Sequence, residues 1–433
     1  MIHSLKISQK IGPVVLLLVL LIGVSSKTAH AQAVMIDDGP GYRTGICEPS
    51  IAIDPSAPNI VYAAAVLDEF YQSADSGKTW TASTMESPYG VWGDPCLVVD
   101  TTGRVYYFHL SDIDGTNWRS KNMLDRIVCQ TKENYDAPFT EGSFTTPNGK
   151  KQDKEWAAVN PANGNVAMSW TQFDAYNDAS PKCKSQILFV ESADGGSSWS
   201  QPLSISEIRG DCLDDDETTE GAVPAYGING SLHVCFSHEG NIYVVNKIED
   251  TWETVKVAQQ DAGWAQSYKG FSRANGMPVL VTDHCKTSPN YGRLYLLWGD
   301  QNTETGGEIY LCYSDDNGQN WSTPESIVAA KDNSDQFLPW LAVDPTSGYL
   351  YAVYYDREGL QGVSTNTTMA ISRDGGQTWE HIQLNEKAFH PTDRTFMGDY
   401  NNISAFGGVV RPIWTEYESG VKSIWTYLYT ETL

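Results

Sequence analysis

The sequence predicts an all-β fold, a seven-bladed β-propeller, and three observations support that prediction. An eight-residue phrase, Ser-x-Asp-x-Gly-x-x-Trp, occurs four times. An apolar run that ends in a turn and continues into a Val/Tyr-rich run occurs seven times, at steps of about 60 residues, which is room for four short strands per unit. No Pro-rich or Gly/Ser-rich linker separates the units. We therefore predict one domain, residues 32–433.

The repeated phrase has residue types that suit a tight turn. Its copies begin at Ser73, Ser192, Ser314 and Ser372 and end at Trp80, Trp199, Trp321 and Trp379. The Asp carboxylate can accept backbone N–H groups, and the Gly can adopt a positive φ. The Trp can anchor the turn by packing. Each copy follows one strand-like run and precedes another, so we predict a structural hairpin turn rather than a catalytic motif.

The phrase resembles the Asp-box, or BNR repeat, of secreted β-propellers in the sialidase-like superfamily. That resemblance covers the repeat and implies no particular reaction. It offers a six-bladed, sialidase-type ring as the alternative fold. Sialidases also carry a Tyr/Phe-Arg-Ile-Pro phrase near the first strand, whereas this chain has Tyr42-Arg43-Thr44-Gly45. The missing phrase counts against a typical sialidase.

The seven units follow one another along the whole chain. Their first apolar runs cover residues 50–54, 96–100, 156–160, 223–226, 278–283, 340–344 and 402–406. The four phrases fall in units 1, 3, 5 and 6, and units 2 and 4 have simpler turns. The last unit ends after its third strand-like run. Because an open sheet edge is a liability, we predict that Val34–Asp37 pairs with the last blade and closes the ring.

The N-terminus and the charge indicate an exported protein. Lys6 and Lys10 precede an apolar run of 14 residues, Ile11–Val24, and small residues follow it, which predicts a signal peptide over residues 1–31. The run is shorter than the roughly 20 residues of a membrane-spanning helix. The formal net charge of −25 argues against nucleic acid or anionic membranes as partners. We expect a secreted monomer, extracellular or periplasmic, without a membrane span.

Eight cysteines all follow the predicted signal peptide. They are Cys47, Cys96, Cys129, Cys183, Cys212, Cys235, Cys285 and Cys312. An even number in an exported chain allows up to four disulfides, whose connectivity the sequence does not give. Their spacing is not that of a zinc site.

Candidate site residues lie just ahead of the predicted innermost strands. Blades of a ring point equivalent positions at one axis, so we expect Glu48, Asp94, Glu220 and Asp399 to converge near the mouth of the central channel. Glu155 and Asp335 should lie close behind. The alternative is that these carboxylates cap the strand starts through backbone N–H groups.

Two carboxylates could act as acid and as base or nucleophile on a glycosidic bond. By resemblance to sialidases, a tyrosine could replace the nucleophile, and the candidates are Tyr42, Tyr268 and Tyr400. The arginines proposed to bind substrate are Arg43, Arg273, Arg357 and Arg394, although each could serve as a loop salt bridge. Trp92 and Trp264 are proposed to stack on sugar rings, whereas Trp156 and Trp340 could pack between blades.

Four converging carboxylates would repel one another without a counter-charge. Ca²⁺ is the candidate cofactor, with Glu48, Asp94, Glu220 and Asp399 as its oxygen ligands. Lys154 could instead serve as an internal counter-ion. The acidic run Asp211–Glu217 is interpreted as a solvated loop between units 3 and 4, with calcium binding as the alternative.

These patterns, together with the resemblance to the sialidase-like superfamily, predict a protein that recognises an extracellular glycan or polysaccharide, and the resemblance favours a sialidase-like glycoside hydrolase. A non-catalytic carbohydrate- or protein-binding scaffold and a polysaccharide lyase stay open, because the fold does not choose among them. A lyase would need a His or Tyr base. The candidate histidines are His109, His233, His238, His284 and His390.

Overall fold

The computed structural model describes residues 32–39, 45–115, 120–302, 305–328 and 334–433. The predicted signal peptide, Tyr42 and Arg43 lie outside these ranges. The described residues form strands, turns and loops without a helix, and they build seven four-stranded antiparallel sheets. The predicted seven-bladed propeller is therefore confirmed, and the six-bladed alternative is wrong. None of the described segments forms a helix with the length and apolar character needed to cross a membrane.

Six blades are continuous in sequence, each running from the innermost to the outermost strand. Blade 1 has β2 (Ser50–Ile53), β3 (Val61–Ala65), β4 (Glu69–Ser73) and β5 (Thr81–Thr84), and blade 2 has β6 (Cys96–Val99), β7 (Val105–Leu110), β8 (Ile127–Lys132) and β9 (Ser143–Phe144). Blade 3 has β10 (Lys151–Val159), β11 (Val166–Phe173), β12 (Ser185–Ser192) and β13 (Leu203–Ser204).

The second half of the ring repeats this order. Blade 4 has β14 (Glu220–Tyr226), β15 (Leu232–His238), β16 (Asn241–Ile248) and β17 (Thr251–Gln259), and blade 5 has β20 (Val279–Thr282), β21 (Leu294–Asn302), β22 (Gly306–Ser314) and β23 (Glu325–Ser326). Blade 6 has β24 (Gln336–Val343), β25 (Leu350–Asp356), β26 (Asn366–Ser372) and β27 (Glu380–Gln383). The short strands β18 (Ala265–Gln266) and β19 (Ala274–Asn275) pair between blades 4 and 5.

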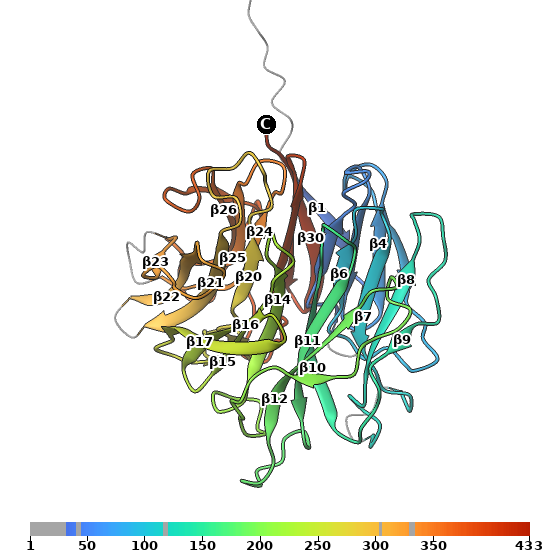
Figure 1. Ribbon diagram of the computed structural model, residues 1–433. Helices are drawn as coiled ribbons and strands as arrows, with labels where there is room; N and C mark the ends of the chain where they lie inside the picture. Colours follow the sequence, from blue (N-terminus) through green and yellow to red (C-terminus); the bar gives the residue numbers. More distant parts are fainter. Residues whose placement is uncertain (1–31, 40–44, 116–119, 303–304, 329–333) are drawn as a thin grey trace, which may run out of the picture.

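The last blade joins the two ends of the chain. It consists of β28 (Asn402–Phe406), β29 (Val409–Glu418), β30 (Val421–Thr430) and, as its outermost strand, β1 (Gln32–Asp37). Val34 pairs with Thr426 and Met35 with Trp425, so the predicted closure by the N-terminal strand is confirmed. In Figure 1, blue β1 lies beside red β30. The innermost strands β2 and β28 also pack together, which completes the ring.

All four repeated phrases form the predicted hairpin turn between the third and fourth strands of a blade. In the copy of blade 1, Ser73 Oγ donates to Asp75 at 2.8 Å, and the Gly77 N–H donates back to Ser73 Oγ at 2.8 Å. The Asp75 carboxylate also accepts the Thr79 N–H at 2.9 Å. Gly77 has a φ of 83°, as predicted for this position. The turn thus satisfies its polar groups within itself.

The turns also join neighbouring blades. In blade 3, Trp199 is half-buried, contacts the ring of Phe108 at 5.7 Å and donates from Nε1 to Ser143 Oγ at 2.8 Å, both in blade 2. The backbone carbonyl of Gly195 accepts a hydrogen bond from Arg104 of blade 2 at 3.1 Å. A Cβ on Gly195 would lie 2.1 Å from that guanidinium, so Arg104 would have to move if a larger residue stood at this position. The predicted blade-joining role of the tryptophan holds for Trp199.

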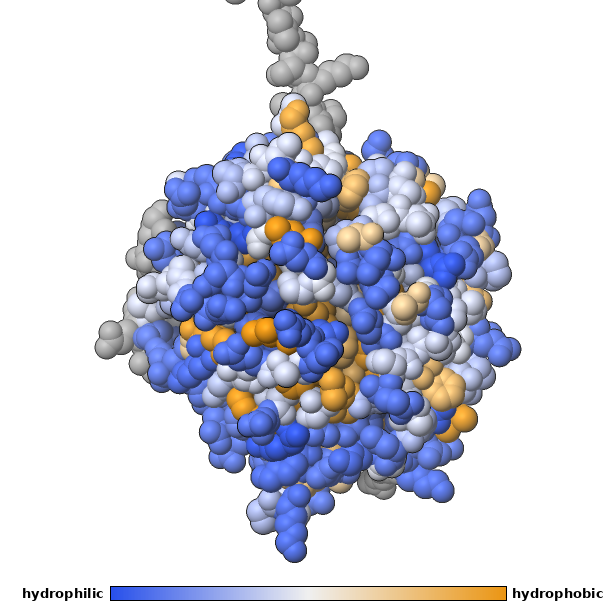
Figure 2. Space-filling model, in the orientation of Figure 1, coloured by the Kyte–Doolittle hydropathy of each residue, from blue (hydrophilic) through white to orange (hydrophobic). Residues whose placement is uncertain are grey.

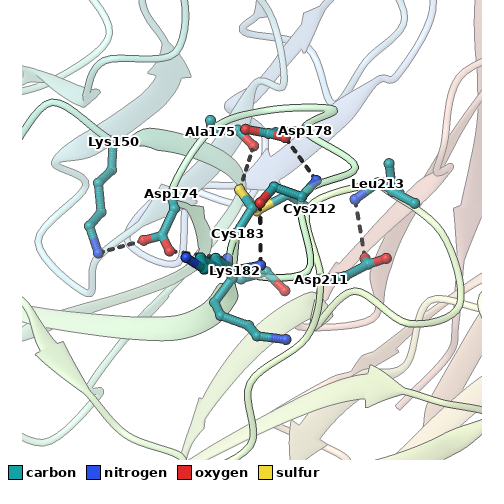
Figure 3. The surroundings of a disulfide bond; sticks show 12 residues. Lys150, Asp174, Ala175, Asp178, Lys182, Cys183, Asp211, Cys212 and Leu213 are labelled. Carbon is teal, nitrogen blue, oxygen red and sulfur yellow. Dashed lines mark hydrogen bonds and ion pairs between the residues drawn. A yellow bond between two sulfur atoms is a disulfide. The ribbon is translucent and has the colours of Figure 1, made fainter.

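One disulfide links Cys183 to Cys212, with 5.8 Å between their Cα atoms. It joins the loop between β11 and β12 to the segment that leads into blade 4 (Figure 3). The other six cysteines are buried thiols. One of the four disulfides that the cysteine count allows is therefore present.

Candidate functional site: a carboxylate cluster at the start of the inner strands

Residues at or just ahead of the start of several inner strands have an unusual backbone. Glu48, Asp94, Lys154 and Leu338 have φ values of 53°, 49°, 54° and 50°. In blade 4 the left-handed residue is Gly221, one position after Glu220. Non-glycine residues rarely adopt this conformation, and such strained positions are common at functional sites. All inner strands run in the same direction, so these positions share one face of the ring, which we call the cluster face.

Lys154 lies at the centre of this face. Its ammonium group forms a hydrogen-bonded ion pair with Asp399 and lies 3.8 Å from Asp94 Oδ2 and 4.0 Å from Glu48 Oε1. The Lys154 side chain is only 5% exposed. Glu48 Oε1 also accepts the backbone N–H of Asp399 at 3.0 Å. Three acids, from blades 1, 2 and 7, therefore meet at the buried ammonium group of a lysine from blade 3.

Arg273, in the segment between β18 and β19, contributes a second cation. Its Nε donates to Asp399 Oδ1 at 2.9 Å, and its Nη2 pairs with Asp399 Oδ2. Its Nη1 lies 3.5 Å from Asp214 Oδ2. The guanidinium stacks over the ring of Phe396 at 5.0 Å. Because its side chain is 45% exposed, Arg273 is the member of the group that solvent reaches most easily.

Two further acids come from blades 3 and 4. Asp214 accepts a hydrogen bond from the Tyr176 hydroxyl at 2.6 Å. Glu220 is fully buried at the start of β14, where Thr171 Oγ1 lies 3.5 Å from its carboxylate. We call the acids Glu48, Asp94, Asp153, Glu155, Asp214, Glu220 and Asp399, with Lys154 and Arg273, the carboxylate cluster.

The cluster holds acids in opposite protonation states. Burial, reinforced by the charge of Asp94, raises the pKa of Asp153 to about 8 and raises the pKa of Glu48 and Glu155 well above the ordinary value. Burial and Asp214 raise the pKa of Glu220 in the same way. For Asp399, burial also opposes ionisation, but Arg273 and Lys154 outweigh it and hold the pKa below the ordinary value. Neutral carboxylic acids therefore lie beside a carboxylate at neutral pH.

Several buried polar atoms in or near the cluster lack a hydrogen-bond partner among the described residues. They are both carboxyl oxygens of Glu155, Oε1 of Glu220 and the hydroxyl of Tyr400. An aromatic layer belongs to the same region, because Trp156 lies 4.3 Å from Trp340 and 5.3 Å from Tyr400, centroid to centroid. Burial and the charge of Asp94 raise the pKa of Tyr400, so its phenol is neutral. Unpaired buried groups of this kind are the groups that a bound molecule can satisfy.

A separate cavity of about 220 Å³ lies between β10, β14 and β20, with Trp156 and Trp340 in its wall. Apolar side chains supply most of its lining, such as Val223, Val281 and Ala225. On the face shown in Figure 2, apolar atoms gather near the middle and hydrophilic residues surround them. The carboxylate cluster is not part of this cavity's lining.

The structure leaves several predicted site residues outside the cluster. Asp335 lies 3.4 Å from Arg357, which is buried and also donates to the Lys269 carbonyl at 2.6 Å. Tyr268 is buried and donates to Gln266 at 2.8 Å. Arg394 is an exposed loop residue. Of the arginines in the described ranges that were predicted to bind substrate, Arg273 alone joins the cluster.

The predicted sugar-stacking tryptophans are buried. Trp92 and Trp264 are each 4% exposed, so neither presents a ring face to solvent. The prediction was wrong because position ahead of an inner strand does not determine which side of the backbone an aromatic ring occupies. Phe396, which is half-buried under Arg273, is the aromatic residue that contacts the cluster from its exposed side.

The geometry does not fit the predicted calcium site. The Lys154 ammonium lies where Glu48, Asp94 and Asp399 converge, the place a calcium ion would need. Glu220 is held instead beside Thr171. Across the described ranges, no three or more His, Cys, Asp and Glu side chains are arranged to hold a metal ion. Lys154, the predicted alternative to calcium, is therefore the counter-charge for these acids.

Sequence reasoning missed Asp153, Asp214 and Tyr176. Asp214 lies in the acidic run interpreted as a solvated loop, yet its side chain is only 11% exposed. Tyr176 is in the loop after β11, where no pattern marks it. Asp153 adjoins a β-bulge in β10, since the register with β11 shifts between Asp153 and Trp156. A bulge of this kind turns side chains to a new direction and leaves no simple sequence signal.

Comparison with known proteins agrees with the repeat and the fold. The BNR/Asp-box repeat model matches residues 370–381, the copy in blade 6. A search of curated proteins finds no match. A Dyadobacter fermentans protein of unknown function superimposes with a TM-score of 0.53 at 12% identity, over 92% of this chain and 98% of that one.

Two other solved structures have the same fold at similarly low identity. A PL25 ulvan lyase bound to -[GlcA(1-4)Rha3S]- gives a TM-score of 0.52 at 13% identity, over 92% of this chain and 96% of the lyase. The endosialidase of phage phi92 gives 0.50 at 10% identity, over 93% of this chain and 69% of the enzyme. At such identities the likeness shows the fold alone. The chain is a seven-bladed β-propeller built with BNR/Asp-box repeats.

Proposed function

We propose that this protein is an exported enzyme that hydrolyses glycosidic bonds of an extracellular glycan or polysaccharide at the carboxylate cluster. The observation that carries the proposal is the grouping of Glu48, Asp94 and Asp399 around Lys154. There, burial raises the pKa of Glu48, while Arg273 and Lys154 outweigh burial and hold the pKa of Asp399 below the ordinary value. Most glycosidases need one carboxylic acid that donates a proton and one carboxylate that acts as base or nucleophile. Environments that push the pKa values of neighbouring acids apart provide that pair.

Glu48 and Asp94 have the geometry for these two roles. Both lie within 4.0 Å of the Lys154 ammonium. Burial and the charge of Asp94 raise the pKa of Glu48, which keeps its proton available for the leaving oxygen. Asp94 has the more exposed side chain, 13% against 4%, so a substrate reaches it first. We assign Glu48 as the acid and Asp94 as the base or nucleophile.

A lyase mechanism has less support in the site. Such an enzyme needs a His or Tyr base, but burial raises the pKa of both Tyr176 and Tyr400, which makes their phenolates hard to form. His284 Nε2 donates to the Tyr226 carbonyl at 2.9 Å, and His390 pairs with Glu418. The structures named above include a polysaccharide lyase and an endosialidase, which supports the glycan class without choosing the reaction.

Export is part of the proposal. The Cys183–Cys212 disulfide supports it, because structural disulfides form mainly in oxidising compartments. The acidic composition fits a partner other than nucleic acid.

The test is a product screen of the purified protein on sialosides and on plant and algal polysaccharides, run in ¹⁸O-labelled water. Hydrolysis places the labelled oxygen in the product, whereas a lyase product contains a new carbon–carbon double bond and no label. Asp94→Asn and Glu48→Gln should lower kcat by about 100-fold or more, the usual contribution of a general acid or base. Asp315→Asn is the matched control, since Asp315 is exposed and pairs with Arg293.

Three outcomes would overturn the hydrolase assignment. Unlabelled, unsaturated products would show a lyase. Glycan binding without any product would show a carbohydrate-binding scaffold. Full activity in Asp94→Asn and Glu48→Gln, with an unchanged circular dichroism spectrum, would place the reaction elsewhere.

A further inference from the structure

We propose that the Cys183–Cys212 disulfide is a positioning element of the carboxylate cluster, which holds Tyr176 and Asp214 against Arg273. The inference rests on the proposed function for its effect on catalysis. Its structural part, the placement of two loops by one covalent bond, can be tested separately.

The disulfide lies between the two loops that supply these residues. Cys183 is in the loop between β11 and β12, seven residues after Tyr176, and Cys212 is two residues before Asp214. Phe173, Cys183 and Cys212 form a small buried cluster, against which Tyr176 packs. Tyr176 contacts the ring of Phe173 at 5.2 Å. Figure 3 shows the two loop segments meeting at the sulfur atoms.

Asp214 needs external support to keep its conformation. Its φ is 55°, in the left-handed region that non-glycine residues rarely adopt. Its carboxylate accepts the Tyr176 hydroxyl at 2.6 Å and lies 3.5 Å from Arg273 Nη1. Arg273 in turn binds Asp399 through Nε at 2.9 Å. A chain of contacts therefore runs from the disulfide through Asp214 and Arg273 to the acid beside Lys154.

The base of the second loop is attached independently of the disulfide. Ser185 and Gly210 exchange backbone hydrogen bonds of 3.1 and 3.2 Å, and the Thr219 N–H donates to Ser185 Oγ at 3.1 Å. These contacts bracket residues 211–218. Asp216 is also held, because it accepts the Glu239 and Ala265 N–H groups, each at 2.7 Å. Loss of the disulfide should therefore release the segment around Asp214 while the blade stays folded. That separation makes a positioning role distinguishable from a general contribution to stability.

The main experiment is a double-mutant cycle in the full mature chain. Asp214→Asn and Cys183→Ser/Cys212→Ser should each lower kcat/KM on the substrate identified above by about tenfold, because small misplacements at a site cost that much or more. The combined variant should be no slower than the slower of the two, because both changes remove the same contact. If the combined variant instead loses kcat/KM by the product of the two separate losses, the disulfide acts on stability alone, and the proposal is overturned.

Hydrogen exchange measures the positioning directly and needs no substrate. In Cys183→Ser/Cys212→Ser, amides of 174–184 and 211–218 should exchange at least about tenfold faster, while the Ser185 and Gly210 amides stay protected. Unchanged exchange in the loops would overturn the positioning claim even if the protein proves to be a hydrolase. Faster exchange in a protein that cleaves no glycan would uphold it and remove the proposed function instead.

Reduction and a second cysteine provide the controls. Dithiothreitol supplies two electrons and two protons, which convert the disulfide into two thiols. It should reproduce the loss in the wild type and have no further effect on the cysteine variant. Cys285→Ser is the matched control, since Cys285 is a buried thiol that donates a hydrogen bond to the Thr346 carbonyl at 3.2 Å. The kcat/KM of this variant should stay at the wild-type value.

Discussion

The two faces of the ring use aspartate in opposite ways. Each Asp-box turn follows the third strand of its blade, which runs parallel to the innermost strand, so the boxes lie on the face opposite the cluster. There, hydrogen bonds from Ser198 lower the pKa of Asp194 to about 2. On the cluster face, burial and neighbouring charge raise the pKa of Asp153 to about 8.

The difference separates structural acids from functional ones. An Asp-box carboxylate is exposed and satisfied by its own turn, so the same local sequence works in any blade. The cluster acids are buried, come from different blades and depend on two shared cations. A repeated sequence marks the residues that build the ring, whereas the site is built by acids that come from different blades and from loops and share no repeated sequence.

The largest effect should come from removing the cluster's central cation. Lys154→Met should lower the free energy of unfolding by about 3–5 kcal/mol, because it leaves buried acids without their partner. Denaturant titration measures the change. Lys78→Met, at an exposed lysine in the box of blade 1, should change it by less than about 0.5 kcal/mol. If the two substitutions lower the free energy of unfolding equally, the lysines of the two faces do not differ in their contribution to stability.

A smaller loss is expected on the Asp-box face. Trp199→Ala should cost about 2 kcal/mol, roughly half the value for a fully buried aromatic, because Trp199 is half-buried. Trp199→Phe should recover part of that stability, since it keeps the contact with Phe108 and loses only the bond to Ser143. Glycan affinity should not change in either variant. Weaker glycan binding would show that the box takes part in recognition.

The protonation of Asp153 predicts a pH-dependent difference. A carboxyl group with a raised pKa in the folded state stabilises the protein below its unfolded pKa of about 4, and that stabilisation is lost as pH rises toward 8. Asp153→Asn removes this group. Relative to the wild type, the variant should therefore gain at least about 1 kcal/mol of stability between pH 5 and pH 8. A difference independent of pH would mean that Asp153 is ionised throughout.

The smallest expected effect is that of calcium. Because Lys154 fills the space between Glu48, Asp94 and Asp399, millimolar Ca²⁺ or a chelator should move the melting temperature by less than about 1 °C. A saturable rise with calcium that Asp94→Asn weakens would show that the ion displaces the lysine.

Most of the fold could be predicted from the sequence because the repeats carry local chemistry. The four boxes, the seven units and the closing strand β1 each follow from patterns within a few residues. The convergence of Glu48, Asp94 and Asp399 also follows, since ring symmetry directs equivalent positions to one axis. Glu220 shares the region but lies one residue before the left-handed Gly221, so it faces Thr171.

The rest of the site depends on loops and bulges that obey no repeat. Tyr176 and Asp214 meet because a disulfide joins two loops, and the cysteine count does not give the pairing. Arg273 directly precedes a strand and Arg357 directly follows one. Arg273 pairs with Asp399 in the cluster, whereas Arg357 pairs with Asp335 outside it. Side-chain direction at irregular backbone decides these contacts, and only tertiary structure determines it.

The most direct test of the central claim is a pH titration of the aspartate and glutamate carboxyl carbons by NMR, assigned with Asp153→Asn and Asp194→Asn. The account predicts that Asp194 titrates near pH 2 and Asp153 near pH 8, with Asp399 ionised over the whole range between them. If Asp153 and Asp194 titrate together near pH 4, Asp153 holds no proton at neutral pH, and the two faces do not differ in the acid chemistry of these aspartates.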